Sequence, residues 1–223
     1  AIGALFAQTN AQEKAVAKPR AKLAVMLVFD QLRADYLMRY KDLFGPGGFN
    51  RFLDKGAWYQ EAHYPYAFTV TGPGHASLGT GCPPRVHGIM GNDWRDRVTG
   101  SEIYCATTER QKNIPPAPPP TSSQGTKRVG GGSPERLLIP TVSDLLKQQS
   151  PQSRVAGFSL KDRGCVLPCG KLGDCVYYWD STTGLFGTST YYRDAVAPWV
   201  DEFNKARPAD KWFNTTWNKL RAD

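Results

Sequence analysis

The sequence predicts an α/β fold: a three-layer α/β/α sandwich with a mainly parallel central sheet. Two apolar runs, at 22–30 and 154–160, are typical of strands that are covered on both faces. Segments with a helical pattern alternate with them, at 34–44, 47–56 and 139–149. Because α/β sheets collect functional groups at the carboxyl ends of their strands, the polar residues that follow these runs are the first candidates for a site.

The N-terminal residues 1–21 resemble the end of a secretory signal peptide. An apolar stretch is followed by small residues, with a cleavage site expected near Ala7 or Ala11. A cloning remnant or an ordinary tail is the alternative. The signal-peptide interpretation predicts a periplasmic or secreted protein.

The first half of the chain then holds a predicted strand, two helices, an aromatic strand and a hairpin, in the order 22–30, 34–44, 47–56, 57–68 and 88–106. The first helix stops at Gly45 and Pro46, which cannot continue it. The aromatic residues of 57–68 favour extended structure. The hairpin is expected to turn near Thr99 and Gly100.

The second half begins with a segment of different composition. Residues 109–134 are rich in Pro, Gly and Ser and predict a surface loop without a core of its own. A helix at 139–149 starts with Pro140 and Thr141. The remaining elements are three strands, the first one buried, and one or two helices, at 154–160, 175–180, 185–192 and 197–220.

Charge and cysteine content restrict the partners. The formal net charge is +8, with 28 Lys and Arg against 20 Asp and Glu, which favours anionic partners. The basic residues are scattered as on a solvated surface, so nucleic acid is not expected. No run approaches the roughly 18 apolar residues of a membrane span. Five cysteines are present, and Cys169 and Cys175 flank a loop short enough for a disulfide to close.

The stretch 68–81, "FTVTGPGHASLGTG", is the first candidate site. A helix that begins near Thr71 would present unpaired amides and the positive end of its dipole to an anion such as phosphate. Pro73 fits the first turn, where its missing donor is not needed. A plain N-cap role for Thr71 is the alternative. A threonine nucleophile requires activation by a base or a metal.

Other polar residues at expected strand ends complete a possible phosphate site. Asp30 is a reasonable metal ligand. Lys161 and Arg163, two apart on a segment expected to be extended, would point to one side and bind phosphate oxygens. Asp162 could instead balance them within a surface patch. Asn92 is either a turn residue or an amide donor to the same anion.

These motifs resemble the alkaline phosphatase superfamily, in particular the zinc-dependent, phosphate-irrepressible alkaline phosphatases with a threonine nucleophile. The resemblance runs from about Lys22 to the end, so residues 22–223 correspond to the N-terminal part of the catalytic domain. The segments that carry it are "VFDQLRADYL", "TGPGHASLGTGCPPRVHGIMGNDW", "SLKDRGCVLPCGK" and "TSTYYRD".

The resemblance implies a role for each candidate. Asp30 and Thr71 would bind one of two zinc ions, and Thr71 would attack phosphorus and carry the covalent intermediate. Asn92, Lys161 and Arg163 would bind the non-bridging oxygens. Related phosphodiesterases lack the Lys-x-Arg pair, so small phosphate monoesters are the expected substrates. The glycines beside Thr71 are expected to make room for the phosphoryl group.

The chain departs from the family pattern in one respect, because the remaining aspartate and histidine ligands have no counterparts in it. His75 and His87 match structural positions of the motifs, and His63 is expected to pack within the aromatic strand. The chain is therefore expected to be part of a longer enzyme, inactive alone. A phosphodiesterase or nucleotide pyrophosphatase of the same fold, or a non-catalytic anion-binding fragment, are the alternatives.

Overall fold

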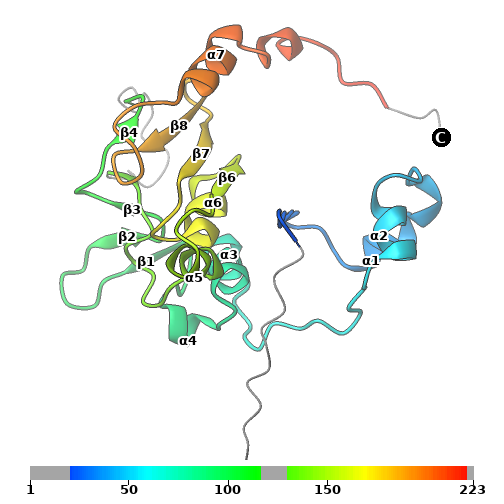
Figure 1. The fold of residues 1–223 in the computed structure, drawn as a ribbon, viewed down its shortest axis with the longest axis horizontal. Coiled ribbons are helices and arrows are strands. Elements are labelled where there is room, and N and C mark those ends of the chain that lie inside the picture. The colour runs from blue at the N-terminus through cyan, green and yellow to red at the C-terminus, as the bar shows by residue number, and fades with distance from the viewer. Residues whose placement is uncertain (1–20, 117–129, 220–223) are drawn as a thin grey trace, which may run out of the picture. The chain divides into compact units, whose positions relative to one another are not determined.

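The computed structural model describes residues 21–116 and 130–219, and the chain forms two compact units, Ala1–Trp58 and Tyr59–Asp223 (Figure 1). The expected signal peptide, apart from residue 21, lies outside the described residues, as does the 117–129 part of the Pro-rich loop. Within the described ranges, no helix has the length and apolar character needed to cross a bilayer.

The first unit contains the two helical segments that the sequence predicts. Its elements are α1 (Asp35–Arg39), the 3-10 helix η1 (Lys41–Leu43) and α2 (Phe49–Lys55). The ring of Phe49 packs against those of Phe29 and Phe44, with centroids 5.3 and 5.0 Å apart. Helix α2 thus presents an aromatic side chain to the segments on either side of α1 and η1.

The strand predicted at 22–30 is not formed. This segment belongs to no helix or strand, and Leu23 and Leu27 are 79% and 66% exposed. A strand is stabilised by hydrogen bonds to a neighbouring strand. The described residues of the first unit contain no strand that could pair with this segment. Its apolar composition is therefore not enough to make it a strand.

The second unit contains the remaining helices, α3 (Thr71–Thr80), α4 (Pro84–His87), α5 (Val142–Gln149), α6 (Asp162–Cys169), α7 (Pro198–Ala206) and the 3-10 helix η2 (Asp210–Trp212). The start of α5 shows why the sequence forms a helix there. Thr141 and Asp144 exchange hydrogen bonds between side chains and backbone amides, at 3.1 and 2.9 Å. This capping box satisfies two amides that a helix start would otherwise leave unpaired.

The strands of the second unit form two small ladders and one larger sheet. The predicted hairpin is confirmed as β1 (Asp93–Arg95) paired with β2 (Glu102–Tyr104). The ends of the Pro-rich segment are also paired, so the loop is shorter than 109–134. The pairs are β3 (Thr107–Thr108) with β5 (Gly131–Gly132), and β4 (Asn113–Ile114) with β8 (Leu185–Ser189). The predicted strand at 57–68 does not form.

The larger sheet has the order β4-β8-β7-β6, where β7 is Cys175–Asp180 and β6 is Ala156–Ser159. The α/β class is confirmed, but among the described strands only β6 and β7 pair in parallel. Strand β6 is at the edge of this sheet, and Phe158 is 54% exposed. It is therefore not the fully buried strand that its apolar composition predicts.

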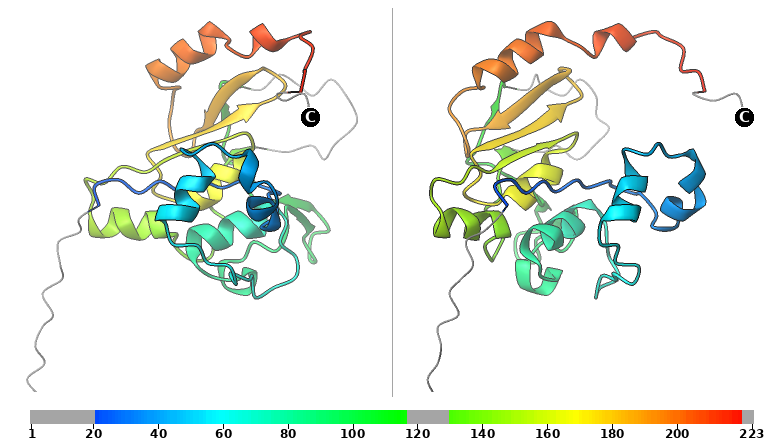
Figure 2. Two further views of the ribbon diagram at one scale, coloured as in Figure 1. Left: turned by 90° about the vertical axis from the view of Figure 1, so that its right-hand side faces the viewer. Right: turned by 45° about the vertical axis from the view of Figure 1, so that its right-hand side comes forward.

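Helices cover both faces of this sheet (Figure 2). Val176 and Tyr178 of β7 pack in a core with Val166 of α6. Tyr177, between them, packs with Val200 of α7 on the opposite face. Because successive strand residues point to opposite faces, the alternation along β7 produces a helix–sheet–helix sandwich. The predicted three layers are present in this part of the chain.

Candidate active site

Helix α3 begins at Thr71, as the sequence predicts. Val70 is extended, with φ −67° and ψ 167°, and occupies the N-cap position, so Thr71 is the first helical residue and not the N-cap. The amide of Gly74 already bonds to the Val70 carbonyl at 3.0 Å. Thr71 is half-buried and lies where the helix dipole favours a negative charge.

The Asn92 side chain is hydrogen-bonded to the start of the same helix. The backbone N–H of Gly72 donates to Asn92 Oδ1 at 2.7 Å. Because an N–H can only donate, the facing atom must be the amide oxygen, which fixes the other amide atom as Nδ2, a donor. The bond stabilises one otherwise unpaired amide of α3. The interpretation of Asn92 as an amide donor to an anion would use its Nδ2 group and stays a prediction.

Gly72 and Gly79 of this segment serve protein packing, and Gly72 does not provide the ligand space that was expected beside Thr71. A Cβ on Gly72 would lie 2.9 Å from the Gly91 carbonyl oxygen and 3.1 Å from Cys105 Sγ. A Cβ on Gly79 would lie 2.7 Å from Pro168 Cα. Gly72 thus allows the hairpin to approach α3, and Gly79 allows α6 to approach it.

Lys161 and Arg163 lie at the start of α6. Lys161 is extended and exposed and occupies the N-cap position, whereas Arg163 is helical and buried. The segment is therefore not extended throughout, because β6 ends at Ser159 and the helix begins at Asp162. The two cations differ in setting: one is on the surface and the other is held within the protein.

Arg163 is held by a buried tyrosine of the hairpin. Its Nη1 donates to the Tyr104 hydroxyl at 2.8 Å, and its guanidinium carbon lies 5.8 Å from the centre of the Tyr104 ring. The Tyr104 hydroxyl in turn donates to Asp162 Oδ1. Burial lowers the pKa of Arg163, because it disfavours the charged guanidinium. The hydrogen bond to Tyr104, the proximity of Tyr104 and the charge of Asp162 outweigh burial, so the pKa of Arg163 is above its ordinary value. Asp162 is thus a buried partner and not part of a surface patch.

Helices α3 and α6 pack side by side in the same direction. At their N-terminal halves, a Cβ on Gly164 would lie 3.8 Å from His75 Nε2. At their C-terminal halves, Gly79 meets Pro168. Both helices therefore begin at the same end of the second unit, and two positive dipole ends point to one region.

Four of the five predicted site residues are brought to this end: Thr71, Asn92, Lys161 and Arg163. Asp30 belongs to the first unit, in a turn in which Leu32 N bonds to the Phe29 carbonyl at 3.3 Å. Tyr104 was missed by sequence reasoning. The hairpin register pairs Tyr104 with Asp93, the neighbour of Asn92. This pairing within the predicted hairpin is a signal that could have indicated Tyr104.

The histidines are engaged in other contacts. His75 Nδ1 donates to the Thr71 carbonyl at 2.9 Å, and His87 Nδ1 accepts from Ile89 N at 3.1 Å, so both serve the local structure as expected. His63 is exposed beside Glu61, at 2.9 Å, and does not pack in a strand.

All five cysteines are free, so the suggested Cys169–Cys175 disulfide is not formed. The sulfur of Cys169 fills the space over Gly157 of β6, where a side chain would not fit. Burial raises the pKa of the Cys169 thiol to about 12, which favours the neutral form. Cys169 therefore acts as a packing residue between α6 and the sheet.

The donor set for zinc is incomplete among the residues that the structure describes. Among residues 21–116 and 130–219, no group of three or more His, Cys, Asp or Glu side chains could hold a metal. Asp30 and Thr71 offer two oxygen donors, whereas a catalytic zinc site generally uses three protein ligands. Each is a donor type that zinc accepts, and the described residues by themselves do not complete a zinc site.

Comparison with known proteins shows that the chain is similar to alkaline phosphatases. The chain is 42% identical over 209 residues to the alkaline phosphatase PafA of Elizabethkingia meningoseptica, covering 93% of this chain and 37% of that protein. It is 37% identical over 214 residues to the alkaline phosphatase PhoV of Synechococcus elongatus, covering 96% of this chain and 37% of that protein. The chain thus spans little more than a third of the length of these relatives.

Solved structures agree in fold. The crystal structure of wild-type PafA superposes with a TM-score of 0.83 at 40% identity, covering 92% of this chain and 38% of that one. A PafA variant with one threonine, one asparagine, one lysine and one arginine replaced gives 0.78 at 37% identity, covering 87% and 36%. The likeness confirms the alkaline-phosphatase-like fold over most of the chain.

The family match covers nearly the whole chain. The sequence pattern described as "Type I phosphodiesterase / nucleotide pyrophosphatase" matches residues 24–221. Together with the relatives above, this match shows that the chain belongs to the type I phosphodiesterase/nucleotide pyrophosphatase family, within the alkaline phosphatase superfamily.

Proposed function

We propose that the protein containing this chain hydrolyses phosphate monoesters through a covalent phosphothreonine intermediate on Thr71. The observation that carries the proposal is the convergence of two helix starts, with Thr71 opening α3 and Arg163 in the first turn of α6. Two positive dipole ends and a buried guanidinium at one end of the unit favour a multiply charged anion there.

Each residue has a task in this mechanism. The Thr71 hydroxyl oxygen attacks phosphorus, and the bond from phosphorus to the leaving-group oxygen breaks. Water then attacks the phosphothreonine, which releases phosphate and restores the hydroxyl. Asn92 Nδ2, Lys161 and Arg163 neutralise the non-bridging oxygens, whose charge must be stabilised throughout the transfer.

Activation of Thr71 requires a further group, because a threonine hydroxyl is a weak nucleophile at neutral pH. Asp30 and Thr71 would hold one of two zinc ions, which would lower the pKa of the hydroxyl and polarise the phosphoryl group. The described residues of this chain do not supply the other ligands. The proposal therefore concerns the complete protein, and the chain alone is expected to be inactive.

A named variant of a relative supports the choice of residues. The PafA variant replaces a threonine and an asparagine that are as far apart as Thr71 and Asn92, and a lysine and an arginine separated by one residue, like Lys161 and Arg163. The relatives named alkaline phosphatase support phosphoester hydrolysis. We propose small phosphorylated metabolites as substrates and an exported, periplasmic or secreted, protein.

A second candidate is a phosphodiesterase or nucleotide pyrophosphatase, which the description of the matching family favours. A monoester carries two negative charges near neutral pH and a diester carries one. The cationic pair at 161 and 163 gives more stabilisation to the dianion, so we favour monoesters over diesters.

The test compares an aryl phosphate monoester with the matching diester, using the product of the full reading frame in zinc. The proposal expects the unmodified protein to prefer the monoester strongly, and it expects monoester turnover to be lost in Thr71→Ala. Thr80→Ala is the matched control, because Thr80 lies at the other end of α3 and its hydroxyl bonds to the Ala76 carbonyl at 2.7 Å. A diester preference would support the second candidate, and absence of turnover would favour an anion-binding protein.

A further inference from the structure

Arg163 is incompletely satisfied within the protein. It is only 9% exposed, and its Nη1 bonds to Tyr104. Its Nε is buried and has no hydrogen-bond partner anywhere in the described ranges 21–116 and 130–219. A buried, unpaired N–H of a charged group is costly, so its persistence points to a partner from outside the described residues.

The Nε and Nη2 atoms form one edge of the arginine guanidinium, and two other arginines of this chain show what this edge binds. Arg33 donates from Nε and Nη2 to both carboxylate oxygens of Asp35, at 2.9 and 3.0 Å. Arg207 does the same with Asp210, at 2.6 and 3.2 Å. The Nε edge of arginine thus matches a pair of anionic oxygens, which a phosphoryl group also offers.

Tyr104 determines which way the guanidinium faces. A tyrosine hydroxyl has one hydrogen, which it donates to Asp162 Oδ1, and it accepts from Arg163 Nη1. Asp162 Oδ1 also accepts from the backbone N–H of Arg163 at 2.8 Å. The hydroxyl is therefore constrained from both sides, and it engages the end of the guanidinium that lies away from Nε.

We infer that Tyr104 is a positioning residue, whose hydroxyl turns Arg163 so that its Nε edge binds two oxygens of the phosphoryl group. This inference rests on the proposed function. Tyr104 touches no substrate; it acts through Arg163. By holding the buried guanidinium in one orientation, it contributes to the preference for dianionic monoesters over diesters.

The experiment measures kcat/KM for the aryl monoester and the diester in Tyr104→Phe, made in the full-length zinc-loaded protein. Removing the hydroxyl leaves Arg163 free to turn, so monoester kcat/KM should fall by about tenfold or more, as expected when a site group is displaced. The diester rate should fall less than about twofold, since it depends less on this cation. Tyr178→Phe is the matched control, because its buried hydroxyl bonds to Asn113 Oδ1 at 2.8 Å, outside the site.

A double-mutant cycle with Arg163→Ala separates positioning from general damage. If Tyr104 acts through Arg163, Tyr104→Phe should cause no further loss in the Arg163→Ala background. Equal loss for both substrates, or additive losses, would overturn the inference. If Tyr104→Phe does not fold, Asp162→Asn must show the same selective loss, because it weakens the acceptor of the Tyr104 hydroxyl.

The two proposals fail differently. An unmodified protein without monoester preference, or one whose preference survives Arg163→Ala, would contradict the proposed function itself. A preference that is lost in Arg163→Ala but intact in Tyr104→Phe would contradict only the role of Tyr104.

Discussion

The backbone N–H of Cys105 donates a hydrogen bond to the carbonyl oxygen of Asn92, at 2.9 Å. This bond continues the β1–β2 hairpin and places the two strand ends side by side. On one strand end, the Asn92 side chain accepts from Gly72 of α3. On the other, Tyr104 bonds to Asp162 and Arg163 of α6. One hairpin therefore links the starts of both helices that carry the proposed phosphate site.

The cationic pair should set substrate preference. In the Lys161→Ala, Arg163→Ala double variant, we expect monoester kcat/KM to fall by about 100-fold to 1,000-fold, the usual effect of removing groups that stabilise developing charge. The diester rate should fall far less. Steady-state kinetics on both substrates measures this, and an unchanged ratio of the two rates would refute the monoester argument.

Gly72 should be intolerant of any side chain. In Gly72→Ala, the new Cβ would press on the Gly91 carbonyl and Asn92 Oδ1, at 2.9 and 3.1 Å. Such overpacking costs about 1–3 kcal/mol, and the displaced Asn92 should lower monoester turnover as well. Gly74→Ala is the matched control, because its Cβ would meet only the Thr69 carbonyl oxygen, at 3.8 Å.

In that control, alanine should stabilise the helix by about 0.5–1 kcal/mol, since glycine is the weaker helix former. Thermal unfolding and turnover of both variants check the pair. Equal stability and activity for the two variants would show that the hairpin does not pack as closely on α3 as described.

His87 should make stability depend on pH. It is fully buried between Ser77 Oγ, at 3.0 Å, and Ile89 N, and burial lowers its pKa below the ordinary value of 6.5. The unfolded chain then binds a proton at a higher pH than the folded one. Its contribution is fully present above pH 6.5 and is lost as pH falls below it, by at most about 1.4 kcal/mol per pH unit.

The check is the thermal unfolding midpoint at pH 7.5 and 5.5. His87→Asn, which does not titrate, should lose less on acidification than the unmodified protein. His63→Gln removes an exposed histidine and serves as the control. Equal acid sensitivity of the unmodified protein and His87→Asn would contradict this prediction.

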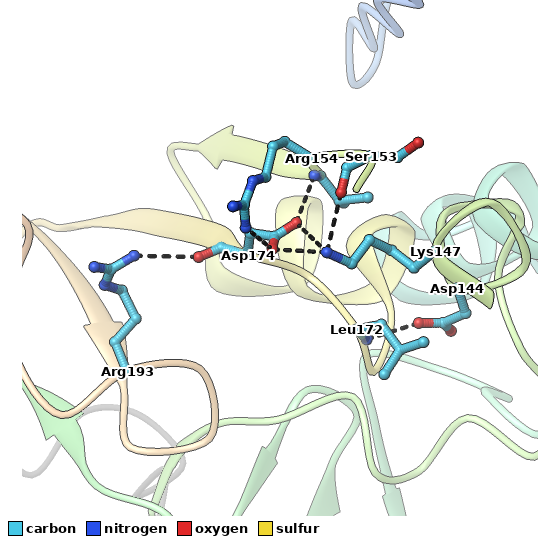
Figure 3. Close-up of polar contacts among 8 residues, drawn as sticks. Asp144, Lys147, Ser153, Arg154, Leu172, Asp174 and Arg193 are labelled. Carbon is cyan, nitrogen blue, oxygen red and sulfur yellow. Dashed lines mark hydrogen bonds and ion pairs between the residues drawn. The ribbon is translucent and has the colours of Figure 1, made fainter. Parts of the chain in front are cut away.

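Asp174 should stabilise the folded state without contributing to the proposed site, from which it is remote. Its carboxylate accepts from Lys147 at 2.8 Å, from Arg154 at 3.1 Å and from Val155 N at 2.8 Å (Figure 3). Partial burial alone would raise the pKa of Asp174, but these donors hold it below the ordinary value. The contribution is therefore present above about pH 3.9 and is lost as pH falls below it.

Asp174→Asn should lower the free energy of unfolding near neutral pH by about 1–3 kcal/mol, because it leaves the partly buried Lys147 ammonium and the Val155 amide poorly paired. Asp201→Asn removes an exposed carboxylate that pairs with Lys205, and it should change little. Substrate preference should be unchanged in both. Equal melting temperatures of the two variants would count against a structural role of Asp174.

The sequence by itself determined the elements whose reasons are local. The capping box of Thr141 and Asp144 lies within four consecutive residues, and α5 forms as expected. The hairpin turn near Gly100 and the helix start at Thr71 have the same origin, in backbone preferences of neighbouring residues. The motifs also identified the family, because the order and spacing of residue types are read from the sequence and require no knowledge of contacts.

Tertiary structure alone decided the partners. The bond from Gly72 to Asn92 spans 20 positions and that from Arg163 to Tyr104 spans 59, so no local pattern specifies them. The apolar run at 22–30 shows the converse, because composition suits a strand but a strand requires a neighbour. Burial of Arg163 and exposure of Lys161, two residues apart, likewise follow from what packs against each side chain and not from its type.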